Sequence, residues 1–181
     1  MLGVKAMIWH PCGGFPFSPD AGVGWHCASA RATCLADMLP DGQPSHHTAP
    51  DEDCNCGIHA LYGMGFLMEY LSLPDVAFYG RCRSRLFTAI LEAFGKVIEH
   101  EYGWRAEAAT IVAVTSSADL ACSLDSDAPQ RQAAAFMGVP LLRGSEVYRV
   151  LADGHVASLV PLRFQAEEGL SGPIRAQPGC R

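Results

Sequence analysis

Four potential metal ligands constrain this chain more than any other feature, because they lie in and around a segment that cannot form long helices or strands. The ligands are Cys34, His47, Cys54 and Cys56. Between Leu39 and Asp53 the chain is rich in proline and glycine, which interrupt regular structure. Zinc takes about four thiolate and imidazole ligands in a tetrahedron. The pattern therefore predicts a zinc knuckle over residues 34–59. A site closed by four protein ligands predicts a structural ion that contributes folding energy.

The spacing within the knuckle leaves alternatives open. Cys54 and Cys56 are one residue apart, less than the usual zinc-finger gap of roughly two to four residues. Buried, reduced cysteines that act as small hydrophobic residues would give the same pattern. An iron–sulfur cluster is the alternative cofactor, since it uses the same thiolates. Gly57 predicts a tight turn that lets backbone amides approach the sulfurs.

The remaining cysteines share no common spacing and are interpreted as ordinary thiols. They are Cys12, Cys27, Cys82, Cys122 and Cys180. A cysteine and a histidine lie near each other at two other places, His10 with Cys12 and His26 with Cys27, and these pairs are the candidates for ligands of a second metal ion.

The composition predicts a globular protein of the cytoplasm. Of the 181 residues, 49% are hydrophobic and 18% are charged, a composition that is sufficient to form one hydrophobic core. We expect a single domain over residues 1–165 and a flexible tail over residues 166–181. No apolar run reaches the roughly 18 residues of a membrane-spanning helix, and the N-terminus does not resemble a secretory signal. In a reducing compartment the cysteines favour metal ligation over disulfides. The net charge of −6 gives no general attraction for nucleic acid or anionic membranes.

Three short motifs resemble an uncharacterised family of bacterial and phage proteins. Residues 47–50 match H-x-A-P, and residues 54–60 match C-x-C-G-I-Y-A except that His59 replaces tyrosine. Residues 95–109 match G-x-V-x-x-H-E-x-G-x-R-A-E-x-A. The resemblance covers roughly residues 3–140, including a lone cysteine at Cys34. It implies no function, and it makes His59 an alternative nitrogen ligand to His47.

The local patterns predict a mixture of strands and helices. Strands are expected at Val4–Trp9 and, around a turn at Asp153-Gly154, at Glu146–Leu151 and Val156–Leu162. Residues 57–73 are ambiguous, with a short helix at Phe66–Leu71 as one interpretation. Asp127 as N-cap and Pro129 in the first turn predict an alanine-rich helix that Gly138 and Pro140 end. The composition of Thr88–Phe94 favours a helix, whereas the family resemblance implies a strand there.

A hairpin is predicted with arms at Lys96–Glu101 and Trp104–Val114, and a turn at Tyr102-Gly103. This turn would pair His100 with Arg105 and Ile98 with Glu107, so that these four side chains share one face. His100, Arg105 and Glu107 are then the candidate catalytic residues, since such a trio suits anion binding or acid–base chemistry. A structural salt bridge that fixes the hairpin is the alternative interpretation.

The sequence as a whole predicts an α+β fold, with a small antiparallel sheet or partly open barrel, a zinc-knuckle loop and one or two packed helices. The favoured function is a zinc-binding or adaptor module with an unknown protein or small-molecule partner. An enzyme that uses the His100 face on a small anionic substrate is the alternative. Nucleic-acid binding through an alternating row of arginines, Arg81, Arg83 and Arg85, is a further alternative.

Overall fold

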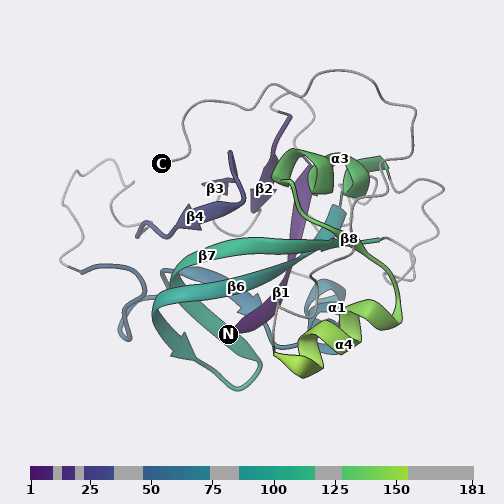
Figure 1. Ribbon diagram of the computed structural model, residues 1–181. Coiled ribbons are helices and arrows are strands. Elements are labelled where there is room, and N and C mark those ends of the chain that lie inside the picture. The colour runs from purple at the N-terminus through teal and green to yellow at the C-terminus, as the bar shows by residue number, and fades with distance from the viewer. Residues whose placement is uncertain (10–13, 19–22, 35–46, 74–85, 117–127, 155–181) are drawn as a thin grey trace.

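A computed structural model describes residues 1–9, 14–18, 23–34, 47–73, 86–116 and 128–154 of the chain (Figure 1). These residues form a mixed α+β fold with an eight-stranded sheet and three helices. In chain order the elements are β1 Leu2–Trp9, β2 Pro16–Ser18, β3 Val23–Gly24, β4 Ser29–Arg31, β5 Ile58–Leu61, α1 Met64–Ser72, β6 Leu86–Glu99, β7 Gly103–Thr115, α3 Ala128–Met137, β8 Leu141–Leu142 and α4 Ser145–Asp153. None of the described helices has the length and the apolar run that a bilayer crossing requires.

The sheet closes partly on itself. β6 pairs with β1 on one edge and with β7 on the other, while β5 pairs with both β1 and β7. The strands β1, β5, β7 and β6 therefore form a ring. Its weakest link lies between β1 and β5, whose register consists of the single pair Val4 and Leu61. The predicted partly open, antiparallel sheet is confirmed, with β7–β8 as a parallel exception.

Apolar side chains are buried on both faces of the long β6–β7 hairpin. One face packs Phe87 against α3, in a cluster that also includes Trp104, and the other packs Ile90 against α1 and α4. Figure 1 shows α3 on one side of the hairpin and the other two helices on the opposite side. The sheet is thus covered by helices on both faces, one helix more than the sequence predicted.

Several predicted elements are confirmed and two are wrong. The strand at Val4–Trp9, the helix at Phe66–Leu71 and the alanine-rich helix after Pro129 are all present, as β1, α1 and α3. Thr88–Phe94 belongs to strand β6, not to a helix. Residues 88–91 are all buried, so this part of the strand lacks the apolar–polar alternation that distinguishes a strand from a helix in sequence.

The strand predicted at Glu146–Leu151 is also wrong, because these residues lie in helix α4. Val147 and Val150 are buried three positions apart, which is helical spacing, and Gly154 ends the helix in a left-handed conformation with φ of 64°. Asp127, the strand at Val156–Leu162 and the tail at residues 166–181 lie outside the described residues.

The predicted hairpin exists, but its register differs by two positions. Ile98 pairs with Arg105, and the His100 amide donates to the Gly103 carbonyl at 2.8 Å, so Glu101 and Tyr102 form the turn. Gly103 pairs with Leu61 of β5 and so belongs to β7, and an added side chain there would collide with the backbone of Ala60. A shift of two positions preserves which side chains share a face, since side chains alternate along a strand.

Candidate metal centre

Cys34 is placed by strand β4. Ala30 of β4 pairs with Ala109 of β7, and the Ala32 amide then donates to the Glu107 carbonyl at 2.7 Å, which extends the contact with β7 beyond the strand. The chain reaches Cys34 two residues later, where the side chain is buried. The first ligand is therefore held by the edge of β7.

Cys54 and Cys56 are placed by a turn that leads into β5. The Cys54 amide donates to the Asp51 carbonyl at 3.2 Å, and the Asp53 amide donates to the Asp51 carboxylate at 3.1 Å. Gly57 follows with φ of 125°, and an added side chain there would lie 3.1 Å from both Pro50 and Arg105. The close turn predicted at Gly57 is present, and only glycine fits it without strain.

The structure brings all four predicted ligands together. One ligand atom from each of Cys34, His47, Cys54 and Cys56 lies within 4.8 Å of the others. The sulfurs of Cys34 and Cys54 are 3.7 Å apart, and Cys56 Sγ lies 3.4 Å from His47 Nε2. All four cysteines of the described residues are free thiols.

These separations fit a tetrahedral metal ion. Zinc bonds of about 2.3 Å to sulfur and about 2.0–2.1 Å to nitrogen place two sulfurs about 3.8 Å apart, and a sulfur and a nitrogen about 3.6 Å apart. A disulfide, in contrast, requires about 2.05 Å between its sulfurs. The donors are three soft thiolates and one imidazole, the set that zinc and other thiophilic metals prefer. By both geometry and chemistry, the cluster therefore fits a site that could hold a metal ion.

Arg105 binds the backbone of the turn that carries Cys54 and Cys56. Its side chain is buried, and its Nη1 donates to the carbonyls of Asp51 and Cys56, each at 3.3 Å, and to the carbonyl of Cys54. Its Nε donates to His100 Nε2 at 2.8 Å. Three thiolates and a divalent ion leave a net negative charge, which a buried guanidinium beside the ligand backbone offsets. Arg105 thus joins the hairpin to the knuckle, a role that could not be predicted from the local sequence pattern.

The two cysteines nearest to Arg105 differ in acidity. Burial raises the pKa of Cys56 to about 11, and the hydrogen bond from its thiol to Cys54 acts in the same direction. The pKa of Cys54 is lowered, because a backbone hydrogen bond from Cys56 stabilises its thiolate. A metal ion that binds here must therefore displace a proton from Cys56.

The other predicted site residues are placed as follows. His59, the alternative ligand, hydrogen-bonds through Nε2 to the Asn55 carbonyl at 3.0 Å and does not belong to the cluster. The trio on the hairpin is divided. His100 contacts Arg105, whereas Glu107 forms its ion pair with Arg31 at 2.9 Å and accepts from the Lys96 amide at 3.2 Å.

The second metal pair and the arginine row gain no support from the described residues. The Cys27 thiol donates to the Ser29 carbonyl at 3.1 Å, and the His26 ring packs on Phe15. His10, Cys12, Cys82, Cys122 and Cys180 lie outside the described residues, as do Arg81, Arg83 and Arg85.

Comparisons with protein-family models, with curated proteins and with solved structures give no significant match to this chain. The chemistry of its own residues is therefore the basis for a function.

Proposed function

We propose that this chain is a zinc-binding module in which Cys34, His47, Cys54 and Cys56 hold a structural ion. The observation that carries the proposal is the convergence of the four ligand atoms within 4.8 Å at separations that suit a tetrahedral ion. Zinc is favoured over an iron–sulfur cluster because the Cys34–Cys54 and Cys56–His47 separations match those of two ligand atoms on a single ion.

A structural role follows from the number of protein ligands. Four side chains fill a tetrahedral ion and leave no position for water or substrate, whereas catalytic zinc sites keep one position open. The ligands come from three parts of the chain, which are the end of β4, the loop at residue 47 and the turn before β5. The ion would therefore fasten residues 47–56 to the edge of β7, and the chain would serve as a binding or adaptor module.

Elemental analysis of protein purified without chelator tests the proposal. We expect one zinc per chain and loss of that zinc in Cys56→Ser. Cys27→Ser is the matched control, because Cys27 is also a free thiol but does not belong to the cluster. Replacement of zinc by cobalt should give the visible absorption of a tetrahedral thiolate site.

Three results would contradict the proposal. They are substoichiometric zinc in both the parent protein and Cys27→Ser, retention of zinc in Cys56→Ser, and iron with sulfide in place of zinc. The last result would assign the same ligands to an iron–sulfur cluster.

A further inference from the structure

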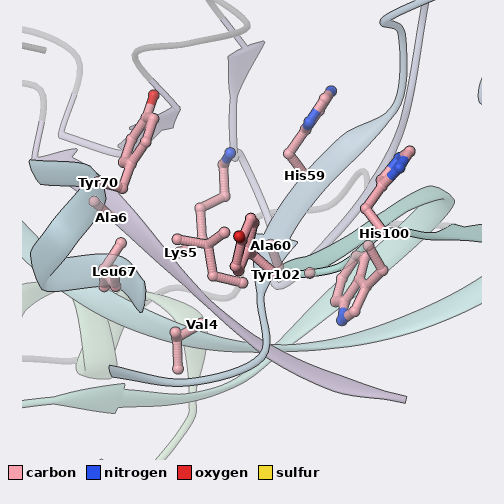
Figure 2. A pocket seen from close by; sticks show the side chains of 12 residues that line it. Val4, Lys5, Ala6, His59, Ala60, Leu67, Tyr70, His100 and Tyr102 are labelled. Atoms are coloured by element: carbon pink, nitrogen blue, oxygen red, sulfur yellow. The ribbon is translucent and has the colours of Figure 1, made fainter. Parts of the chain in front are cut away.

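Helix α1 borders two hollows of the molecule. Leu67 and Tyr70 line the gap between β1 and β5, where Figure 2 shows them beside Lys5. The first turn of α1 and Glu69 line a second hollow, a groove of about 620 Å³ whose other wall is helix α4. Figure 1 shows α1 and α4 on the same side of the β6–β7 hairpin. None of the four metal ligands lines this groove, so it is a feature separate from the knuckle.

Aromatic side chains stand on both walls of the groove. Phe66 comes from α1 and is 40% exposed, and Tyr148 comes from α4 and is 59% exposed. Tyr102, in the β6–β7 turn, extends the α1 wall, because its ring centroid lies 5.3 Å from that of Phe66 with an angle of 58° between the rings. Large apolar side chains that are exposed together are typical of a surface that contacts a ligand or a partner.

The charged groups at the groove are acidic. Glu69 is exposed on the α1 wall, and none of the described residues that line the groove is basic. Tyr62 also lines the groove and donates through its hydroxyl to the Glu99 carboxylate at 2.9 Å, which brings a second negative charge to the edge. The first turn of α1 adds the positive end of a helix dipole, about half an elementary charge, which the full charge of Glu69 outweighs. The groove therefore favours a cation.

The two tyrosines beside the groove respond to this negative charge. A hydrogen bond to Glu101 raises the pKa of Tyr102, and burial and the charge of Glu69 act in the same direction. Burial raises the pKa of Tyr62, and the hydrogen bond to Glu99 and the charge of that carboxylate add to the effect. A negative field that opposes the ionisation of a phenol also attracts a cation to the same place.

Aromatic rings beside a carboxylate distinguish between classes of cation. Calcium and magnesium ions take about six oxygen ligands or keep much of their water, whereas the groove wall offers one carboxylate. An alkylated ammonium ion spreads its charge over methyl groups, which pack against the faces of aromatic rings. We propose that this groove binds an alkylated ammonium ion, with its charge beside Glu69 and its methyl groups against Phe66 and Tyr148. The proposal does not depend on which metal the knuckle holds.

Titration of the full-length, metal-loaded chain by ¹⁵N NMR tests the site. The probe is choline, and its control is the neutral alcohol in which a carbon atom replaces the choline nitrogen. Choline should cause saturable shifts at Gly65, Phe66 and Tyr148. It should bind at least about fivefold tighter than the alcohol, the usual gain from a cation against exposed aromatic rings. Benzyltrimethylammonium should bind more tightly than choline, since its ring adds aromatic contacts.

The variant Glu69→Gln separates charge from shape. It keeps the size of the side chain and removes its charge, so it should weaken choline binding by at least about fivefold and leave binding of the alcohol unchanged. Glu92→Gln is the matched control, because Glu92 is exposed on β6 and does not line the groove. Tyr148→Leu keeps an apolar side chain and removes the ring, so it should weaken choline binding by about two- to fivefold.

Several results would overturn the proposal. They are the absence of saturable shifts with both ammonium ions, equal binding of choline and the alcohol, equal effects of Glu69→Gln and Glu92→Gln, and unchanged choline binding in Tyr148→Leu. Shifts confined to the gap between β1 and β5 would also overturn it, because the ion would then bind in the other hollow. The spectra of the variants show in the same experiment whether the β6–β7 hairpin stays folded.

Discussion

The β6–β7 hairpin and the segment at residues 47–56 lie against each other through Arg105, yet different interactions hold them in place. The hairpin is paired along most of its length and contributes buried side chains to two apolar clusters. In the segment, only Ala49, Pro50 and Cys56 are buried, and the Cys54 amide bonds within its own turn. The knuckle has a small apolar cluster of its own, which consists largely of the metal ligands.

This difference predicts which region of the chain a bound ion would order. Small zinc domains without a core unfold when the ion is lost. Here the sheet has a core that does not include the ligands, so we expect the ion to order the segment rather than the whole fold. The structure thus modifies the expectation, drawn from the sequence, that a closed site contributes to folding as a whole.

The largest effect should come from the core of the hairpin. Phe87 is completely buried in the cluster that packs against α3. Phe87→Ala should lower the free energy of global unfolding by about 3–5 kcal/mol, through lost burial and the cavity left behind. Denaturant unfolding measures this loss. Zinc content should stay at one per chain while the variant is folded, and parallel loss of zinc from the folded variant would contradict the separation of the two regions.

Removal of the metal is the opposite perturbation. Chelation should abolish amide exchange protection in residues 47–57 and leave the central pairs of β6 and β7 protected, because local opening does not require the sheet to unfold. Hydrogen exchange read by mass spectrometry distinguishes the two regions directly. Loss of protection throughout the hairpin would show that the knuckle and the sheet form one cooperative unit.

Zinc affinity should rise with pH. The pKa of Cys56 is raised to about 11, so its thiol is protonated at neutral pH, and zinc must displace that proton. The proton from Cys56 alone makes the affinity at least about tenfold higher for each pH unit, or at least about 100-fold between about pH 6 and pH 8, and each further proton displaced from another ligand steepens the slope. Competition with a chelator of known pH dependence measures this slope. An affinity independent of pH would mean that Cys56 is not a ligand.

Arg105 connects the two regions, and its removal should weaken the metal site without emptying it. Arg105→Met should lower zinc affinity by about 10- to 100-fold, the usual effect of losing a group that orients metal ligands. Arg149→Met, at an exposed position of α4, removes the same charge and should leave the affinity unchanged. Equal effects of the two variants would show that Arg105 acts only through net charge.

The sequence predicted which cysteine and histidine side chains lie together better than it predicted what surrounds them. Donor type and spacing are local, so Cys34, His47, Cys54 and Cys56 could be assigned without knowing the fold. Arg105 could not be assigned to the knuckle, because its contact with the Cys54 carbonyl joins residues 51 positions apart. Strand β6 was mistaken for a helix where both of its faces are buried, and this depends on packing that the chain does not encode locally.

Helix α4 was missed although a local signal was present. Glu146 lies in the first turn of the helix, where a negative charge is favourable, and its carboxylate accepts from the Arg143 amide at 2.9 Å. Gly154 at the end of the helix was interpreted as a turn between strands, which it would also suit.

The smallest effect should come from the charged pair at the exposed end of the hairpin. Arg31 is 78% exposed and Glu107 is 25% exposed, so Arg31→Met should change the free energy of unfolding by only about 0–1 kcal/mol. Glu107→Gln should also leave zinc affinity unchanged, because Glu107 contacts Arg31 and the Lys96 amide and not Arg105. Denaturant unfolding measures the effect of Arg31→Met, and isothermal titration with zinc compares Glu107→Gln with Arg105→Met. If Glu107→Gln weakened zinc binding as much as Arg105→Met, then His100, Arg105 and Glu107 would act together. The separate contacts that the structure shows for Glu107 and Arg105 would then not give them separate effects on zinc affinity.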